Sequence, residues 1–469
     1  MIPLVAFPEL VEHYAPHFAE VFSQEAFIQF KRYISGLIVS ENKTVEGINR
    51  LFVHESRSQS SLNRLLTQSP FSLVRLNQGR LSLLNSLPGT QLKPKGVLSL
   101  DDTLLTHYGD QFEQIAKLYD HSQGRYVWAH NLVTLHYSDE QTDYPVLFEL
   151  WQPADLARIE QGLGVVGIKL KQNKQTLKTS EPHKWRQYLL GVWRRHQNKA
   201  EVVALYDSKL RIAERLLQQW VQLYPSLKLP VTFDSWYTQP SFCHFIEKLG
   251  LPYVGTLTDQ TEVILKRGRQ RLDVFADHLK QEHLAALKQD QLPVFKPLTI
   301  RFKGEKEQYY SYCQTHRINN FGKLRLVINH RRADLSDKPV FYSTNRLLWQ
   351  AAGITHIRRH RWPVEVFHEE GKAEGLDQYQ LRDFEAIERH VALVALVYSL
   401  LRAAQQDPVL QQKLQGELKL ELEGSVPFWR RATQAHSLWS LALFISAGLA
   451  QGQSLDQLMA PLLRAVCAR

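Results

Sequence analysis

Cysteine is scarce in this 469-residue sequence. The three cysteines, Cys243, Cys313 and Cys467, form no CxxC pair, so we expect neither a disulfide framework nor a cysteine zinc site. The scarcity fits a reducing compartment. The first residues lack the basic start and long apolar stretch of a signal peptide. We therefore expect a cytoplasmic protein.

Long hydrophobic runs are lacking as well. The most apolar segments, 391–401 and 438–449, are too short to cross a bilayer core of about 30 Å. We interpret both as buried helices and predict no membrane association. Internal repeats and low-complexity segments are also absent from the sequence.

Acidic residues are outnumbered by basic ones. Lysine and arginine total 57 against 47 aspartates and glutamates, a formal net charge of +10. This excess favours a polyanionic partner, with nucleic acid ahead of an acidic membrane surface. The 44% hydrophobic content can bury a sizeable core, and the length predicts two to four domains.

The N-terminal part, residues 1–95, has the three-to-four spacing of amphipathic helices. Two short helical segments, 43–53 and 60–66, flank the polar turn HESRSQS. In a basic protein this pattern is typical of a helix-turn-helix that reads DNA. A helical cap on the next domain fits the same pattern, and both interpretations stay open.

The central part predicts a mixed α/β catalytic core from residues 96–257 and 346–390. Its strand-like runs are GVLSLDD, GRYVWAHNLVTLHYS, DYPVLFELW, LPVTFD and LPYVGTL, with helices between the later ones. Residues 258–345 alternate in the strand period and predict a mostly β, basic insertion. Residues 391–469 predict a helical C-terminal domain.

Four acids stand at positions suited to catalysis. Asp101 and Asp102 end the first core strand, Asp234 ends another, and Glu365 follows Pro363. Proline is tolerated only in a first helical turn, so we expect a helix from about residue 362 with Glu365 near its start. Carboxylates on two strand ends and a helix suit a pair of Mg²⁺ ions. Singly, each aspartate could instead be a turn former or helix cap.

Basic residues and histidines surround this region. Lys266, Arg267 and Arg269 form a run that could follow a DNA backbone or remain a solvated loop. His356 and His360 are four apart, as in a helical zinc pair. Interleaved arginines should repel a cation, so we expect no metal at these histidines.

The segment around Glu365 resembles the DDE transposases of bacterial insertion sequences. Arg361, Glu365 and Lys372 match the spacing of the cut-and-paste group, which has Tyr, two residues, Arg, three residues, Glu, six residues and Lys. The flanking RW-x-V-E-x-F and the later GLDQYQLRDF are similar to this group too. Arg358 stands at the tyrosine position, a departure that leaves the role of this residue open.

Both aspartates of the family have counterparts here. The first usually precedes threonine after an apolar strand, which Asp102-Thr103 fits and Asp101 does not. The second ends a strand before a helix, as Asp234 does. The resemblance implies a ribonuclease-H-like core that binds two Mg²⁺ or Mn²⁺ ions through Asp102, Asp234 and Glu365.

The resemblance also implies a reaction and partners. The enzyme would cut double-stranded DNA at terminal inverted repeats and use the freed 3′-hydroxyl to attack target DNA. Arg358, Arg361 and Lys372 would contact phosphates near the cut. A homodimer would hold the transposon ends together, and the protein would associate with the nucleoid.

Two other functions are compatible with parts of the sequence. A catalytically silent, domesticated or inhibitory transposase-derived protein would bind DNA and keep the acids. A glycoside hydrolase would use Asp234 and Glu365 as acid and base. The positive charge and the arginines beside Glu365 disfavour the hydrolase.

Overall fold

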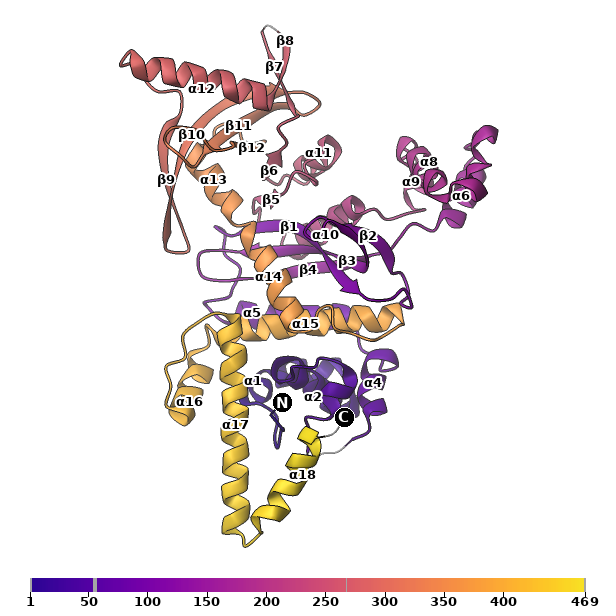
Figure 1. Cartoon of the computed structure of the whole chain (residues 1–469), viewed down its shortest axis with the longest axis vertical. Helices are drawn as coiled ribbons and strands as arrows, with labels where there is room; N and C mark the ends of the chain where they lie inside the picture. Colours follow the sequence, from indigo (N-terminus) through magenta and orange to yellow (C-terminus); the bar gives the residue numbers. More distant parts are fainter. Residues whose placement is uncertain (1, 54–56, 267, 468–469) are drawn as a thin grey trace.

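A twelve-stranded sheet runs through the upper and middle parts of the molecule, with helices below and beside it (Figure 1). The computed structural model describes residues 2–53, 57–266 and 268–467. The strands are β1 Val97–His107, β2 Ala116–Asp120, β3 Arg125–Ser138, β4 Asp143–Trp151, β5 Val231–Phe233, β6 Tyr253–Leu257, β7 Glu262–Leu265, β8 Gly268–Arg271, β9 Lys296–Phe302, β10 Glu305–Ile318, β11 Gly322–His330 and β12 Val340–Thr344.

Five strands form the core in the order β4-β3-β1-β5-β6. The first three, β1, β3 and β4, pair antiparallel, while β5 is parallel to β1 and β6 is parallel to β5. Helices connect β4 to β5 and β5 to β6. This is the ribonuclease-H-like arrangement, so the predicted fold class is confirmed.

The insertion continues the core sheet. Its strand β12 pairs antiparallel with β6, and β11, β10, β7 and β8 follow outward. The insertion also holds a helix, α12 Leu272–Lys288, beside its β-strands. Leu272, Phe275, Ala276 and Leu279 are buried at three-to-four spacing, which makes α12 amphipathic and holds it on the sheet.

Helices from both ends of the chain pack around α15 Phe384–Ala404. This helix is buried along most of its length and contacts β4, α2, α4, α5, α14 and α17. The predicted domain boundary at residue 390 lies inside it. The flanking helices are α1 Glu9–Tyr14, α2 Gln24–Val39, α3 Val45–Asn49, α4 Gln59–Thr67 and α5 Leu73–Ser86, then α16 Pro408–Leu418, α17 Val426–Ala450 and α18 Leu455–Cys467, with a 3-10 turn at Ala15–Val21.

The two helices of the predicted helix-turn-helix correspond to α3 and α4. Residues 54–56 of the turn between them lie outside the described residues. Leu62, Leu65 and Leu66 of α4 are buried, and α4 packs on α2 and α15. These contacts fit the helical-cap interpretation and leave the DNA-reading one open.

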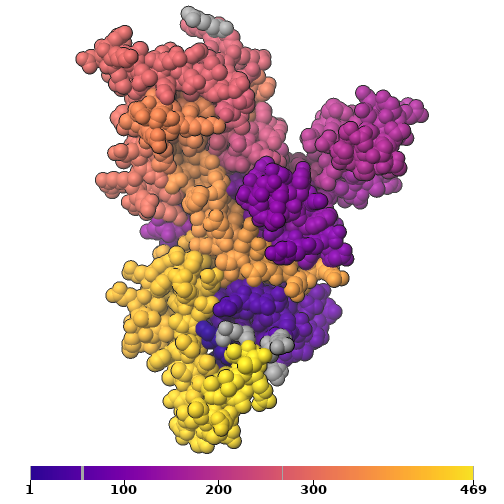
Figure 2. Space-filling model, in the orientation of Figure 1, coloured from indigo at the N-terminus to yellow at the C-terminus, as the bar shows by residue number. Residues whose placement is uncertain are grey.

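A small helical unit stands out to one side of the core (Figures 1 and 2). It consists of α6 Leu156–Val165, α7 Leu177–Ser180, α8 Pro182–Arg195, α9 Ala200–Val203 and a 3-10 turn at Gln172–Lys174. Its separate core contains Trp185, Leu189, Val192 and Trp193 of α8, together with Ile159, Leu163 and Val202. In the described ranges no helix is long and apolar enough to cross a membrane.

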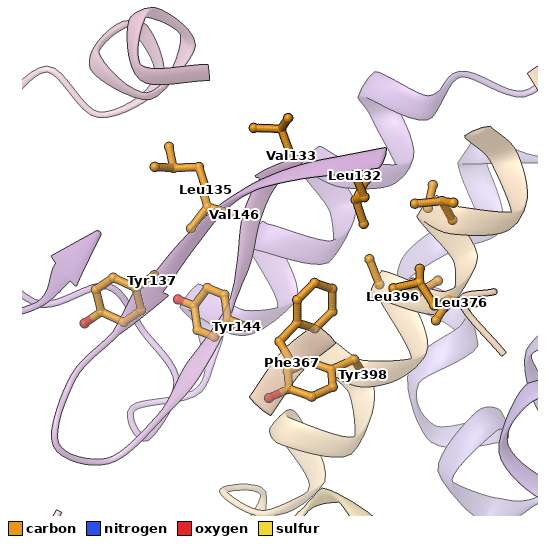
Figure 3. Close-up of a cluster of buried hydrophobic side chains, with 14 of the residues drawn as sticks. Leu132, Val133, Leu135, Tyr137, Tyr144, Val146, Phe367, Leu376, Leu396 and Tyr398 are labelled. Carbon is orange, nitrogen blue, oxygen red and sulfur yellow. The ribbon is translucent and has the colours of Figure 1, made fainter. Parts of the chain in front are cut away.

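The remaining helices lie against the core sheet. They are α10 Lys209–Leu223, α11 Pro240–Lys248, α13 Ala351–Arg359 and α14 Trp362–Ala373. Figure 3 shows how α14 and α15 pack on β3 and β4: Phe367 and Tyr398 lie beside Tyr144 and Leu132. The rings of Phe367 and Tyr398 pack edge to face, with 4.9 Å between their centres. This packing fixes the position of α14 on the sheet.

A buried carboxylate network reinforces the same packing. Asp143, at the start of β4, accepts hydrogen bonds from Tyr398 Oη at 3.0 Å, Arg402 Nη2 at 2.9 Å and Lys303 Nζ at 2.6 Å. Burial acts to raise the pKa of Asp143, but Arg402, His136 and Lys303 outweigh it and hold the pKa well below its usual range. The network ties β4, α15 and the insertion together.

Replacing Asp143 by alanine should therefore lower the free energy of unfolding by about 3–5 kcal/mol, because the variant leaves the buried Arg402 without its counter-charge. Urea denaturation followed by tryptophan fluorescence measures the change. The control is Glu160→Ala, which removes an exposed ion pair with Lys178 and should cost less than about 1 kcal/mol. Equal losses in the two variants would contradict the role assigned to the network.

Candidate active site

Strand register places Asp101 beside Asp234. In the parallel pair of β1 and β5, Leu100 lies opposite Phe233. Asp101 is the next residue of β1 and Asp234 directly follows β5, and neighbouring positions of a parallel pair face the same side of a sheet. In agreement with this register, the charge of Asp234 acts to raise the pKa of Asp101.

Helix α14 brings Glu365 to the same side. The helix begins at Trp362 with Pro363 in its first turn and Glu365 also there, as the sequence predicted. Arg361, its N-cap residue, donates from Nη1 to Asp101 Oδ2 at 2.6 Å and from Nη2 to Glu365 Oε1. One guanidinium thus bridges two acids that come from distant parts of the chain.

Asp102, predicted as the first metal-binding aspartate, lies on the other face of β1. Its Oδ2 accepts hydrogen bonds from Asn131 Nδ2 at 2.7 Å and Lys209 Nζ at 2.9 Å. Its Oδ1 accepts a hydrogen bond from Tyr237 Oη at 2.9 Å. Successive residues of a strand point to opposite faces, so Asp101 and Asp102 cannot both face Glu365. The aspartate–threonine pair in the sequence carried no information on which face would be covered by α14.

Negative charge is in excess within this cluster. Burial raises the pKa of Asp101 to about 7; Arg361 opposes this shift, while Asp102 and Asp234 add to it. Asp234 Oδ1 accepts hydrogen bonds from the backbone N–H groups of Trp236 and Tyr237, which also makes it a turn former. Carboxylate oxygens that crowd one place suit a hard divalent cation, whose charge would offset their mutual repulsion, so this donor set fits such an ion.

Arg358, which stands at the tyrosine position of the spacing compared in the sequence, lies near the acids, whose charges act on it. Its Nε donates to Thr256 Oγ1 at 2.8 Å, and its guanidinium lies 5.7 Å from the centre of the Tyr342 ring. Burial and the neighbouring Arg361 lower its pKa to about 10, although Asp234 and Asp101 act to raise it. Arg358 therefore remains charged at neutral pH.

A basic pocket opens beside the carboxylates, with a volume of about 210 Å³. Arg358 and Arg361 belong both to its lining and to the surroundings of the acids. The other lining groups include two more arginines and three aromatic residues: Arg331, Arg359, Tyr309, Tyr342 and Trp362. Guanidinium groups and aromatic faces together suit a phosphate with its attached base.

The other predicted DNA contacts lie farther out. Lys372 is two turns along α14 from Glu365, where its charge acts on Asp120 and Asp377. Lys266 and Arg269 are exposed on the β7–β8 hairpin, and Arg269 Nη1 lies 3.7 Å from Glu262 Oε2. Arg267 lies outside the described residues. Of the described residues in this set, Lys266, Arg269 and Lys372 are not brought to the carboxylate cluster.

Two family models match the sequence. The model for DDE superfamily endonucleases matches residues 17–271, more than half of the chain, and the model for the transposase DDE domain matches residues 212–400. The chain belongs to the DDE superfamily. Enzymes of this superfamily use divalent metals, in agreement with the oxygen-rich donor set of the carboxylate cluster. Membership supports a nuclease or transposase rather than the glycoside hydrolase that the sequence left open.

Structural similarity is more distant. A cryo-electron-microscopy structure of the piggyBac transposase synaptic complex with hairpin DNA is 11% identical and has a TM-score of 0.41. The alignment covers 97% of the present chain and 82% of the piggyBac transposase chain. Among curated proteins, none matches the sequence significantly.

Proposed function

We propose that this DDE enzyme is an insertion-sequence transposase, which cuts DNA at terminal inverted repeats and joins the freed ends to target DNA. One observation carries the proposal. Asp101, Asp234 and Glu365 converge on one side of a ribonuclease-H-like sheet, around the bridging Arg361. Membership of the DDE superfamily supports this reaction class.

The proposed ligands of two Mg²⁺ or Mn²⁺ ions are Asp101, Asp234 and Glu365, with Asp101 in place of Asp102. When bound, the ions would activate the attacking oxygen and stabilise the leaving oxygen of the phosphodiester. Arg358 and Arg361 are suited to hold phosphate oxygens, because guanidinium groups bind them through two parallel hydrogen bonds. Asp102 would instead hold α10 on the sheet through Lys209.

DNA is the proposed partner over a wider surface. The net charge of +10 supports it, and Lys266, Arg267, Arg269 and Lys372 are the proposed backbone contacts outside the pocket. We further propose a DNA-binding role for residues 1–95, a homodimer that pairs two transposon ends, and association with the nucleoid. The proposed domains also include an insertion at 258–345 and a C-terminal part at 391–469, whose first residues belong to α15.

Divalent-ion binding by the cluster should depend on pH. Because burial raises the pKa of Asp101 to about 7, the carboxyl group becomes protonated as the pH falls below that value. Protons then compete with the ion, and each pH unit below the pKa should weaken Mn²⁺ binding about tenfold. Above the pKa the affinity should level off.

Electron paramagnetic resonance of free Mn²⁺, titrated with protein between about pH 6 and about pH 8, measures this dependence. The Asp101→Asn variant is the control, since it lacks the titrating group and should show a flatter profile. An affinity that is constant over this pH range in the unmodified chain would contradict the role of Asp101.

A cleavage and strand-transfer assay tests the function itself. The substrate is a DNA duplex that ends in the short inverted repeats bracketing the coding region. With Mg²⁺ we expect nicking at the repeat end and joining to a target plasmid, with a short direct duplication of the target. Sequence-specific end binding without cleavage, in Mg²⁺ and in Mn²⁺, would overturn the proposal and favour the silent, transposase-derived DNA-binding protein.

A further inference from the structure

A second group of metal-binding side chains lies outside the carboxylate cluster. It consists of Glu140 in the β3–β4 turn, His356 in α13 and His360 at the C-cap of α13. One ligand atom from each residue lies within 4.8 Å of the other two. Glu140 and His356 are 216 positions apart in the chain, so the fold alone brings them together.

The distances suit a small ion. His356 Nε2 lies 2.7 Å from Glu140 Oε1, and His360 Nε2 lies 3.8 Å from the same oxygen. Zinc binds histidine nitrogen and carboxylate oxygen at about 2.0–2.2 Å, which sets tetrahedral ligand atoms about 3.4 Å apart. On binding zinc, the distance from Glu140 to His356 would lengthen and the distance from Glu140 to His360 would shorten, each by less than about 1 Å. The exposed side chain of Glu140 can move this far.

His360 is held in the orientation that a ligand needs. It is 1% exposed, and its Nδ1 makes a hydrogen bond of 2.9 Å with Ser138 Oγ. Its buried Nε2 has no hydrogen-bond partner among the residues that the structure describes. A buried polar atom without a partner is costly, and metal-binding histidines usually engage their other nitrogen in this way. Both features point to a ligand at Nε2.

The charges of Arg359 and Lys303 act on His360, but each of these cations is paired with a carboxylate, and the other arginines of the segment have partners of their own. Arg359 Nη2 lies 2.7 Å from Glu307 Oε1, Arg361 bridges the catalytic acids, and Arg358 donates to Thr256. The amine of Lys303 is paired with Asp143 at 2.6 Å. Residues adjacent in a helix point in different directions, so interleaving in sequence does not mean crowding in space.

We propose that Glu140, His356 and His360 bind one zinc-class transition-metal ion, with water in the remaining position. Glu140 is 51% exposed and His356 34%, so the ion has access from solvent. Glu140 Oε2 also accepts a hydrogen bond of 2.8 Å from the backbone N–H of Lys303, in the β9–β10 turn. The ion would thus join the β3–β4 turn, the insertion and α13. Its ligand His360 directly precedes Arg361 in the chain.

The test uses the full-length chain with Glu365→Gln, which weakens binding at the acidic cluster. Zn²⁺ alone is titrated in competition with a chromophoric chelator, and Co²⁺ alone is titrated while its visible absorption is recorded. We expect one tight site and a cobalt spectrum of low coordination number. Glu140→Gln or His356→Ala should weaken binding at least about 100-fold, since even partners of the ligands contribute roughly 10–100-fold.

His244→Ala is the matched control, because His244 is an exposed helical histidine in α11 and should leave Zn²⁺ affinity unchanged. Both test substitutions are at partly exposed side chains, so the variants should fold, and circular dichroism checks this. Zn²⁺ should raise the melting temperature of the parent but not of the two variants. Absence of a tight site in the parent, or unchanged affinity in both variants, would overturn the proposal.

Discussion

Replacing Glu365 by glutamine is expected to slow DNA-end cleavage by at least about 10³-fold, while the affinity for the DNA end changes by less than about threefold. Removing one group that stabilises developing charge commonly costs about 10²–10³ in rate, and loss of a metal ligand adds to this. Glutamine keeps the shape of the side chain and an oxygen that can accept from Arg361. The fold should therefore be retained.

Single-turnover cleavage of an end-labelled duplex measures the rate, and a gel-shift titration measures binding. Glu369→Gln is the matched control: it lies one turn farther along α14 and is exposed. Its cleavage rate should stay within about twofold of the parent, the usual scale for a surface change away from the chemistry. Retention of cleavage in Glu365→Gln would remove this residue from the proposed ion-binding set.

The second large expected effect distinguishes the role of Asp101 from that of its neighbour Asp102. Asp101→Asn should reduce cleavage by at least about 10³-fold, because the side chain faces Asp234 and is bridged to Glu365 by Arg361. Asp102→Asn should keep cleavage within about tenfold of the parent. It should lower the free energy of unfolding by about 1–2 kcal/mol, through weaker hydrogen bonds to Lys209 and Tyr237.

The same cleavage assay and urea denaturation of both variants provide the comparison. Lys209→Met supplies a control for the Asp102 side, since it removes the cation that binds Asp102 and should reproduce the stability loss without abolishing cleavage. If Asp102→Asn were inactive and Asp101→Asn active, the ion-binding role would return to Asp102, as the aspartate–threonine pair in the sequence predicts.

Local patterns predicted the helices and strands well because each depends on nearby residues. Pro363 permits a helix to begin only just before it, so the start of α14 and the place of Glu365 in its first turn followed from the sequence. Apolar runs between turn residues marked β1, β3, β4, β5 and β6. The order of these strands confirmed the ribonuclease-H-like core.

The histidine pair shows which part of a candidate metal site local sequence cannot supply. His356 and His360 were visible at helical spacing, but their neighbours in sequence were arginines and the third ligand was out of sight. Glu140 reaches them only because β3 turns back into β4 beneath α13 and the insertion. No local signal connects a turn glutamate with a helix more than 200 residues away.

By itself, the sequence determined the kinds of elements, the start of α14, the basic character of the chain and, through the spacing of Arg361, Glu365 and Lys372, the resemblance to DDE transposases. The tertiary structure decided which of Asp101 and Asp102 faces Glu365. It also decided which partner each arginine of the 358–361 segment contacts. The physical reason is that a strand offers side chains to both faces alike. The two sides differ only because α14 packs on one face and α10 on the other.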